Sequence, residues 1–160
     1  MAEQPGAPAT PVDARAIPLD RAQRILSAIW FVFSGLIVAL LIVQTLLHAY
    51  DFEGVSVVAQ VWNWALPQFV PTLSLMIGVF AATALAPPVA DPPRVNRGFL
   101  LLAASLSAIY LALVMGTIFA EALWRDAGPI KLMETANLWL APFQGLVASA
   151  LGALFVSTKR

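Results

Sequence analysis

The chain has 160 residues with nine Lys and Arg, nine Asp and Glu and no Cys, so its formal net charge is zero. Hydrophobic residues make up 60% of the chain and charged residues 11%, whereas a soluble domain averages roughly 45–50% and about 25%. A chain this short cannot bury such an apolar surplus in a soluble core, and it has no basic excess to neutralise nucleic-acid phosphates. The composition therefore excludes a soluble domain, a nucleic-acid partner and disulfide or Cys-ligated metal chemistry, and it predicts an integral membrane protein.

The first 20 residues contain four prolines among Ala, Thr and charged residues. Repeated proline removes backbone donors and fixes extended backbone, so a helix cannot form there. We predict a disordered cytoplasmic tail over residues 1–20, and a single membrane domain over residues 21–160.

Three apolar stretches of bilayer-spanning length are easily recognised, since a helix needs about 20 residues to cross the hydrocarbon core. They cover residues 25–50, 99–123 and 136–157, and the first has no charged residue. A Pro-rich linker over residues 87–98 precedes the second of these stretches and is expected to be cytoplasmic.

A further apolar region, residues 55–86, is too long for one untilted span. It contains two tryptophans and two prolines, namely Trp62, Trp64, Pro67 and Pro71. Because tryptophan favours the membrane–water interface, we predict an interfacial segment over residues 55–65 and a span over residues 66–86. One long kinked helix is the alternative, since proline is tolerated within membrane helices. The predicted fold is thus all-α, with four transmembrane helices arranged as two hairpins.

The charged residues predict the orientation of these spans. The side that holds both termini and the linker has seven Lys and Arg and four acidic residues, and the opposite side has two and five. The positive-inside rule therefore places both termini in the cytoplasm, with the protein in the cell (inner or plasma) membrane. Four tryptophans are expected to anchor the outer boundary: Trp62, Trp64, Trp124 and Trp139.

The two halves of the chain resemble each other at an offset of 75 residues. The rarer matching pairs are Asp51 with Asp126, Trp64 with Trp139, and Pro67 with Pro142. This pattern predicts a parallel internal repeat related by an axis along the membrane normal. The alternative is that two hairpins of similar anatomy arose independently.

Polar and small residues predict how the helices associate. The polar candidates for interhelical hydrogen bonds, or for a polar vestibule open to the outside, are Gln44, His48, Gln60, Asn63, Gln68, Thr72, Asn137 and Gln144. The glycines in small-xxx-small patterns are Gly35, Gly78, Gly116, Gly145 and Gly152. Such stripes let helices approach closely, either within this bundle or between subunits.

The sequence predicts no catalytic, cofactor-binding or metal-binding residue. The centres of the spans carry no charged side chain that a proton relay or an ion-coupled carrier would need. His48 is the only histidine, and it lies near the outer end of its span beside the carboxylates of Asp51 and Glu53. A lipid- or quinone-directed enzyme is therefore disfavoured, because no nucleophile or metal cluster accompanies these groups.

The remaining function is association. We predict a non-catalytic multi-pass membrane protein that acts through helix–helix contacts, as a homo-oligomer or as an accessory subunit of a membrane complex. Its partners are then the lipid bilayer and either a second copy or another membrane subunit. The alternative is a channel or a membrane-permeabilising oligomer with an outward polar vestibule.

Overall fold

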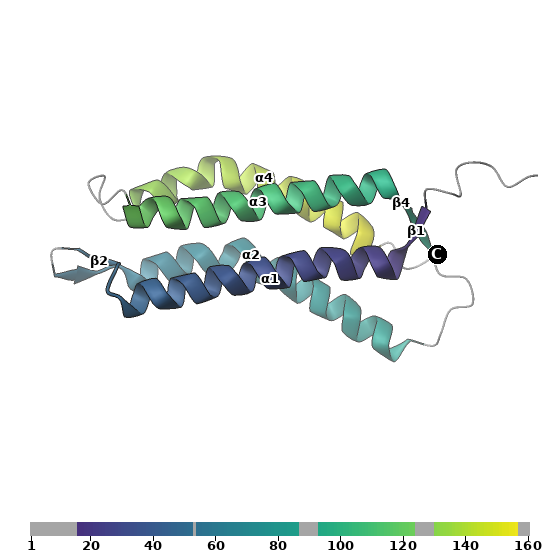
Figure 1. The fold of residues 1–160 in the computed structure, drawn as a ribbon, viewed down its shortest axis with the longest axis horizontal. Coiled ribbons are helices and arrows are strands. Elements are labelled where there is room, and N and C mark those ends of the chain that lie inside the picture. The colour runs from purple at the N-terminus through teal and green to yellow at the C-terminus, as the bar shows by residue number, and fades with distance from the viewer. Residues whose placement is uncertain (1–15, 53, 87–92, 124–129, 157–160) are drawn as a thin grey trace, which may run out of the picture.

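Four long helices dominate the structure, a computed structural model that describes residues 16–52, 54–86, 93–123 and 130–156. They are α1 (Leu19–Leu46), α2 (Val58–Leu85), α3 (Arg97–Leu123) and α4 (Lys131–Val156) (Figure 1). Each is long and apolar enough to cross a membrane. The prediction of a helical multi-pass membrane protein is thus confirmed, although α1 begins and ends earlier than residues 25–50 and α4 begins earlier than residue 136.

Two small antiparallel sheets, which the sequence analysis did not predict, join the helix ends. Strand β1 (Ala16–Pro18) pairs with β4 (Arg94–Asn96), and β2 (Asp51–Phe52) pairs with β3 (Val55–Ser56). Ile17 lies opposite Val95 and both pack against the core, while the Leu19 amide donates to the Pro93 carbonyl at 2.9 Å. The predicted tail and linker are therefore ordered where they meet, because apolar side chains and backbone donors pair there. Residues 1–15 and 87–92 lie outside the described part.

Helix α2 runs without a break through Pro67 and Pro71, so the predicted interfacial segment over residues 55–65 is wrong and the single long helix is correct. Pro71 has no N–H to donate to the Pro67 carbonyl four residues earlier. The side chain of Gln144 on α4 donates to that carbonyl instead, at 3.2 Å. Helix α4 contains Pro142 in the same way, and Figure 1 shows both helices bent midway.

The corresponding helices of the two halves are in contact, α1 with α3 and α2 with α4. Helix α1 packs against α2 and α3, and α4 packs against α3 and α2. A two-fold axis along the bundle would place α1 opposite α3 and α2 opposite α4. The observed neighbours differ from that arrangement, so the predicted repeat axis does not describe the bundle.

The core follows a seven-residue pattern along α1 and α3. Spacings of three and four residues separate the buried side chains Gln23, Ser27, Trp30, Ser34, Ile37, Leu41 and Gln44 on α1, and Leu100, Ala103, Ser107, Tyr110, Val114, Thr117 and Glu121 on α3. This 3.5-residue period is typical of helices that cross at a small angle. The rings of Trp30 and Tyr110 stack with their centroids 6.0 Å apart, so large side chains fill the middle of the bundle.

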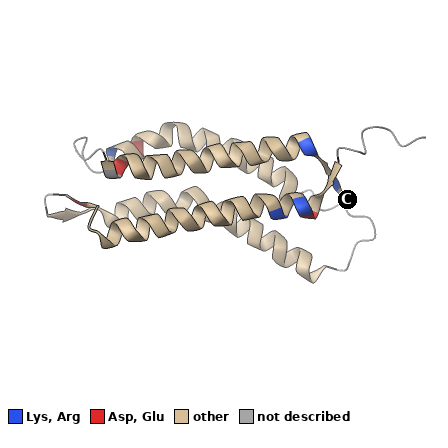
Figure 2. Cartoon of the chain, in the orientation of Figure 1, with Lys and Arg blue, Asp and Glu red and all other residues tan. Residues whose placement is uncertain are grey.

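Charged residues lie only at the two ends of the described bundle (Figure 2). Four arginines and Asp20 gather where β1 and β4 pair, and Lys131 with three carboxylates gathers at the opposite end. The uncharged middle is the part that fits the hydrocarbon core of a bilayer.

Candidate helix-association site

A cluster of hydrogen-bonded polar side chains joins helices α2, α3 and α4. The Tyr110 hydroxyl on α3 donates to Gln68 Oε1 on α2 at 2.7 Å. Asn137 Oδ1 on α4 accepts from Trp64 Nε1 at 3.0 Å and from Gln68 Nε2 at 3.4 Å. We call Trp64, Gln68, Tyr110 and Asn137 the amide cluster. It fixes the position of α2 against both α3 and α4.

The sequence positions these groups through the helical repeat. Trp64 and Gln68 are four residues apart and share one face of α2, and both are buried. Each interhelical hydrogen bond in a membrane contributes about 0.6–2 kcal/mol, so the amide cluster stabilises the packing of α2 modestly but specifically.

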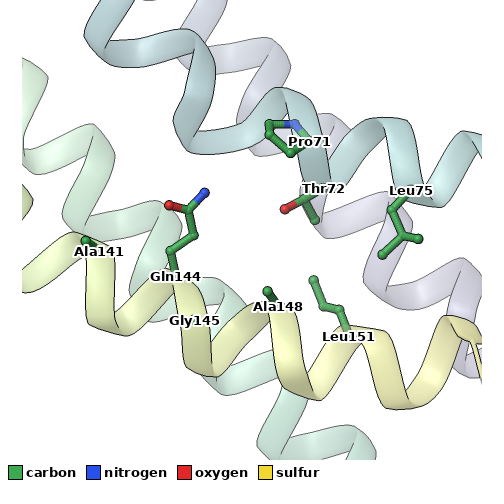
Figure 3. Close-up of a pocket in the computed structure, with 8 residues that line it drawn as sticks. All are labelled: Pro71, Thr72, Leu75, Ala141, Gln144, Gly145, Ala148 and Leu151. Atoms are coloured by element: carbon green, nitrogen blue, oxygen red, sulfur yellow. The ribbon is translucent and has the colours of Figure 1, made fainter.

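An open groove lies beside the amide cluster, between α2 and α4 (Figure 3). Its volume is about 470 Å³, and it is lined by Pro71, Thr72, Leu75, Ala141, Gln144, Gly145, Ala148 and Leu151. Figure 3 shows the Gln144 side chain pointing from α4 towards α2. The rest of the α4 wall consists of the small residues Ala141, Gly145 and Ala148 and of Leu151. A Cβ added at Gly145 would meet no atom within 4 Å, so this wall is uncovered.

The second half of α2 leaves the bundle beyond this groove. Met76 is its last buried residue, and from Ile77 to Leu85 every side chain is exposed or half-buried. Phe80 still meets Phe155 of α4 edge to face, with ring centroids 6.4 Å apart. The bend at the prolines therefore opens one side of the chain between α2 and α4.

The eight predicted polar residues do not converge on a single vestibule. Two belong to the amide cluster and two line the groove: Gln68, Asn137, Thr72 and Gln144. Gln44 accepts a hydrogen bond from the Tyr50 hydroxyl, and His48 Nδ1 lies 2.7 Å from Asp51 Oδ2 in the turn after α1. Gln60 and Asn63 are exposed on α2.

The predicted tryptophan anchors have three different surroundings. Trp62 donates to Thr45 Oγ1 at 3.3 Å, and Trp64 is buried in the amide cluster. Trp139 is 43% exposed and lines a shallow hollow over Gly116 of α3. Trp124 lies outside the described residues.

None of the predicted packing glycines touches a neighbouring helix of this chain. A Cβ added at any of them would meet no atom within 4 Å, which holds for Gly35, Gly78, Gly116, Gly145 and Gly152. Small residues buried along α1 and α3 instead include Ser27, Ser34, Ala103 and Ser107. Contact between subunits, the alternative prediction, concerns Gly145, which lines the α2–α4 groove.

Two buried tyrosines and one buried carboxylate escaped the sequence analysis. Glu121 Oε1 accepts from the Ile130 amide at 2.7 Å, and so closes the turn between α3 and α4. Tyr50 packs in the connection between α1 and α2, at the same end of the bundle as Glu121, where burial and then the Glu121 charge raise its pKa to about 12 from an ordinary value of 10.0. Tyr50 and Glu121 lie at the ends of charge-free stretches, whereas Tyr110 lies in the middle of one.

Tyr50 makes stability fall at high pH. Unfolded chains lose the Tyr50 proton near pH 10.0, whereas the folded protein keeps it to about pH 12. Between these values the unfolded state binds fewer protons, so the free energy of unfolding decreases as the pH rises. We expect detergent-unfolding midpoints to drop across this window, and to drop less in Tyr50→Phe. An equal drop in both proteins would contradict this role of Tyr50.

The chemistry of this region is that of packing and hydrogen bonding. Across residues 16–52, 54–86, 93–123 and 130–156, no group of three His, Asp or Glu side chains is placed to hold a metal ion. No protein-family model matches the chain, and no curated protein or solved structure matches it either.

Proposed function

We propose that this protein acts by helix–helix association in the membrane, as a homo-oligomer or as an accessory subunit, and that the α2–α4 groove receives the partner's helix. The observation that carries the proposal is the groove itself. It combines a wall of small residues with two polar residues, the half-buried Gln144 and the buried Thr72.

Lipid is a poor occupant for such a surface. Acyl chains supply no hydrogen-bond partner for the Thr72 hydroxyl or for the Gln144 amide oxygen, whereas a membrane helix brings backbone and side-chain groups close to a small-residue wall. Helices associate in membranes through such close van der Waals contact and interhelical hydrogen bonds. A helix in the groove would cover Ala141, Gly145 and Ala148 together.

Gly145→Leu tests this association without disturbing the isolated bundle. The added side chain starts in open space, so it fills the groove and blocks a partner helix. We expect energy transfer between donor- and acceptor-labelled copies in liposomes to fall, with association about tenfold weaker, a loss of about 1.4 kcal/mol. If the partner is a different subunit and not a second copy, we expect the tagged variant to recover less of that subunit from native membranes than the unmodified protein does.

Gly35→Leu is the matched control, because Gly35 is equally open but lies on α1 away from the groove. Its association should equal that of the unmodified protein. A chain that stays monomeric in liposomes and captures no partner by crosslinking in native membranes would refute the proposal.

Support for the channel alternative is weaker. Trp30 and Tyr110 fill the bundle centre, and the predicted polar residues are spread over several places. A conducting path would have to lie between chains. Association is therefore the function that this geometry supports better.

We also propose that both termini face the cytoplasm. The chain has no Cys, so a single introduced cysteine reports topology cleanly. In intact cells we expect a membrane-impermeant maleimide to label Val55→Cys, between α1 and α2, and to spare Arg94→Cys before α3. Permeabilised cells should show labelling of both. Labelling of Arg94→Cys but not of Val55→Cys in intact cells would show that the termini face outwards and would contradict the proposal.

A further inference from the structure

A second groove lies at the other end of the bundle, between α1 and α3 and beside the paired strands β1 and β4. Its volume is about 500 Å³. Arg21 and Ile25 line it from α1, and Arg97, Leu101 and Ala104 line it from α3. These positions are one or two turns apart on each helix, so each helix presents one continuous face to the groove.

The groove is charged at one end and apolar along the rest. Both helices begin at the same end, where β1 is paired with β4. Arg21 and Arg97 lie in the first turns, and Ile25, Leu101 and Ala104 lie further into the spans. The groove therefore has a cationic mouth, formed by Arg21 and Arg97, and an apolar floor, formed by Ile25, Leu101 and Ala104.

The two arginines at this mouth have no carboxylate partner among the described residues, whereas Arg24 is paired with Asp20 at 2.8 Å. Both Arg21 and Arg97 are exposed. A guanidinium group presents a planar fork of donors that matches phosphate oxygens. Two such groups from adjacent helices are suited to one phosphate group.

The apolar floor identifies the source of that phosphate. Leu101 is 57% exposed and Ile25 is 40% exposed, and both belong to membrane-spanning helices. A free anion would leave this floor uncovered, whereas an acyl chain would fill it. Basic pockets between transmembrane helices bind anionic lipid headgroups in this way.

We propose that this groove binds one anionic glycerophospholipid. Its phosphate lies between Arg21 and Arg97, and one acyl chain runs along Ile25, Leu101 and Ala104. The site would tie α1 to α3 on the membrane side of the β1–β4 sheet. It does not depend on the α2–α4 groove.

Native mass spectrometry of the full chain, titrated with phosphatidylglycerol or phosphatidylcholine, tests the proposal. We expect one phosphatidylglycerol to bind more tightly than any later one, and phosphatidylcholine to show no such first site. In R21Q/R97Q the first affinity should fall about thirtyfold, from the loss of two charged contacts. R24Q is the matched control and should keep it, because Arg24 does not line the groove.

A second variant separates lipid from free phosphate. Ala104→Trp fills the apolar floor and leaves both arginines in place, so it should also abolish the first site. Inorganic phosphate at millimolar concentration should not displace the lipid. The proposal is overturned by unchanged affinity in R21Q/R97Q, by an equal loss in R24Q, by full binding in Ala104→Trp, or by displacement with phosphate. Exposed arginines tolerate substitution, and circular dichroism of each variant verifies its helix content.

Discussion

Tyr110→Ala is expected to lower the free energy of unfolding by about 3–5 kcal/mol, as removal of a large buried aromatic side chain does. Tyr110 is fully buried and stacks on Trp30, so truncation leaves a cavity between α1 and α3. It also removes the donor to Gln68 in the amide cluster. Reversible unfolding in mixed micelles of SDS and a mild detergent measures the change.

Tyr110→Phe is the control that separates the ring from the hydroxyl. It keeps the stacked ring and removes only the hydrogen bond, so its cost should be about 0.6–2 kcal/mol. Equal losses in the two variants would show that the hydrogen bond, and not the ring packing, dominates at this position.

Replacing both Pro67 and Pro71 with Ala should straighten α2 and reshape the α2–α4 groove. Sharp bends in helices arise mainly at proline, and the restored amides would pair with the carbonyls four residues earlier. The Pro67 carbonyl then no longer needs Gln144 as its donor. Association should weaken about tenfold, because the wall formed by Thr72 and Leu75 moves.

Spin labels at Ala82 and Ala153, both exposed, measure this change directly. The main distance between the ends of α2 and α4 should shift in the double variant. Leu66→Ala is the control, since Leu66 is adjacent to Pro67 but does not line the groove. An unchanged distance in the double variant would show that the rest of the bundle, and not the prolines, sets the bend.

Local sequence predicted the number and approximate position of the helices well. A charge-free run of more than 20 residues has one stable conformation in lipid, because every backbone group must be paired within the segment. The same rule explains the error at residues 55–65. Trp62 and Trp64 resemble an interfacial pair by composition, but Trp64 finds a polar partner in Asn137 on a distant helix.

The sequence did not predict which residues contact each other across different helices. The amide cluster depends on α2 lying beside α4, and the outward glycines depend on which face of each helix the bundle buries. Both features depend on the order of the helices around the bundle. Four apolar stretches of similar composition do not determine that order. Gln68 was identified as polar and membrane-embedded, but Tyr110 was not linked to it, because they are on different hairpins.

The pairing of β1 with β4 sets an order of events during synthesis. Ile17 and Val95 are opposite each other in the sheet, and the whole first hairpin lies between them in the chain. Strand β1 therefore has no partner until α1, α2 and then β4 have been synthesised. The β1–β4 pairing, which joins the starts of α1 and α3, thus forms only after α1 and α2 have been synthesised.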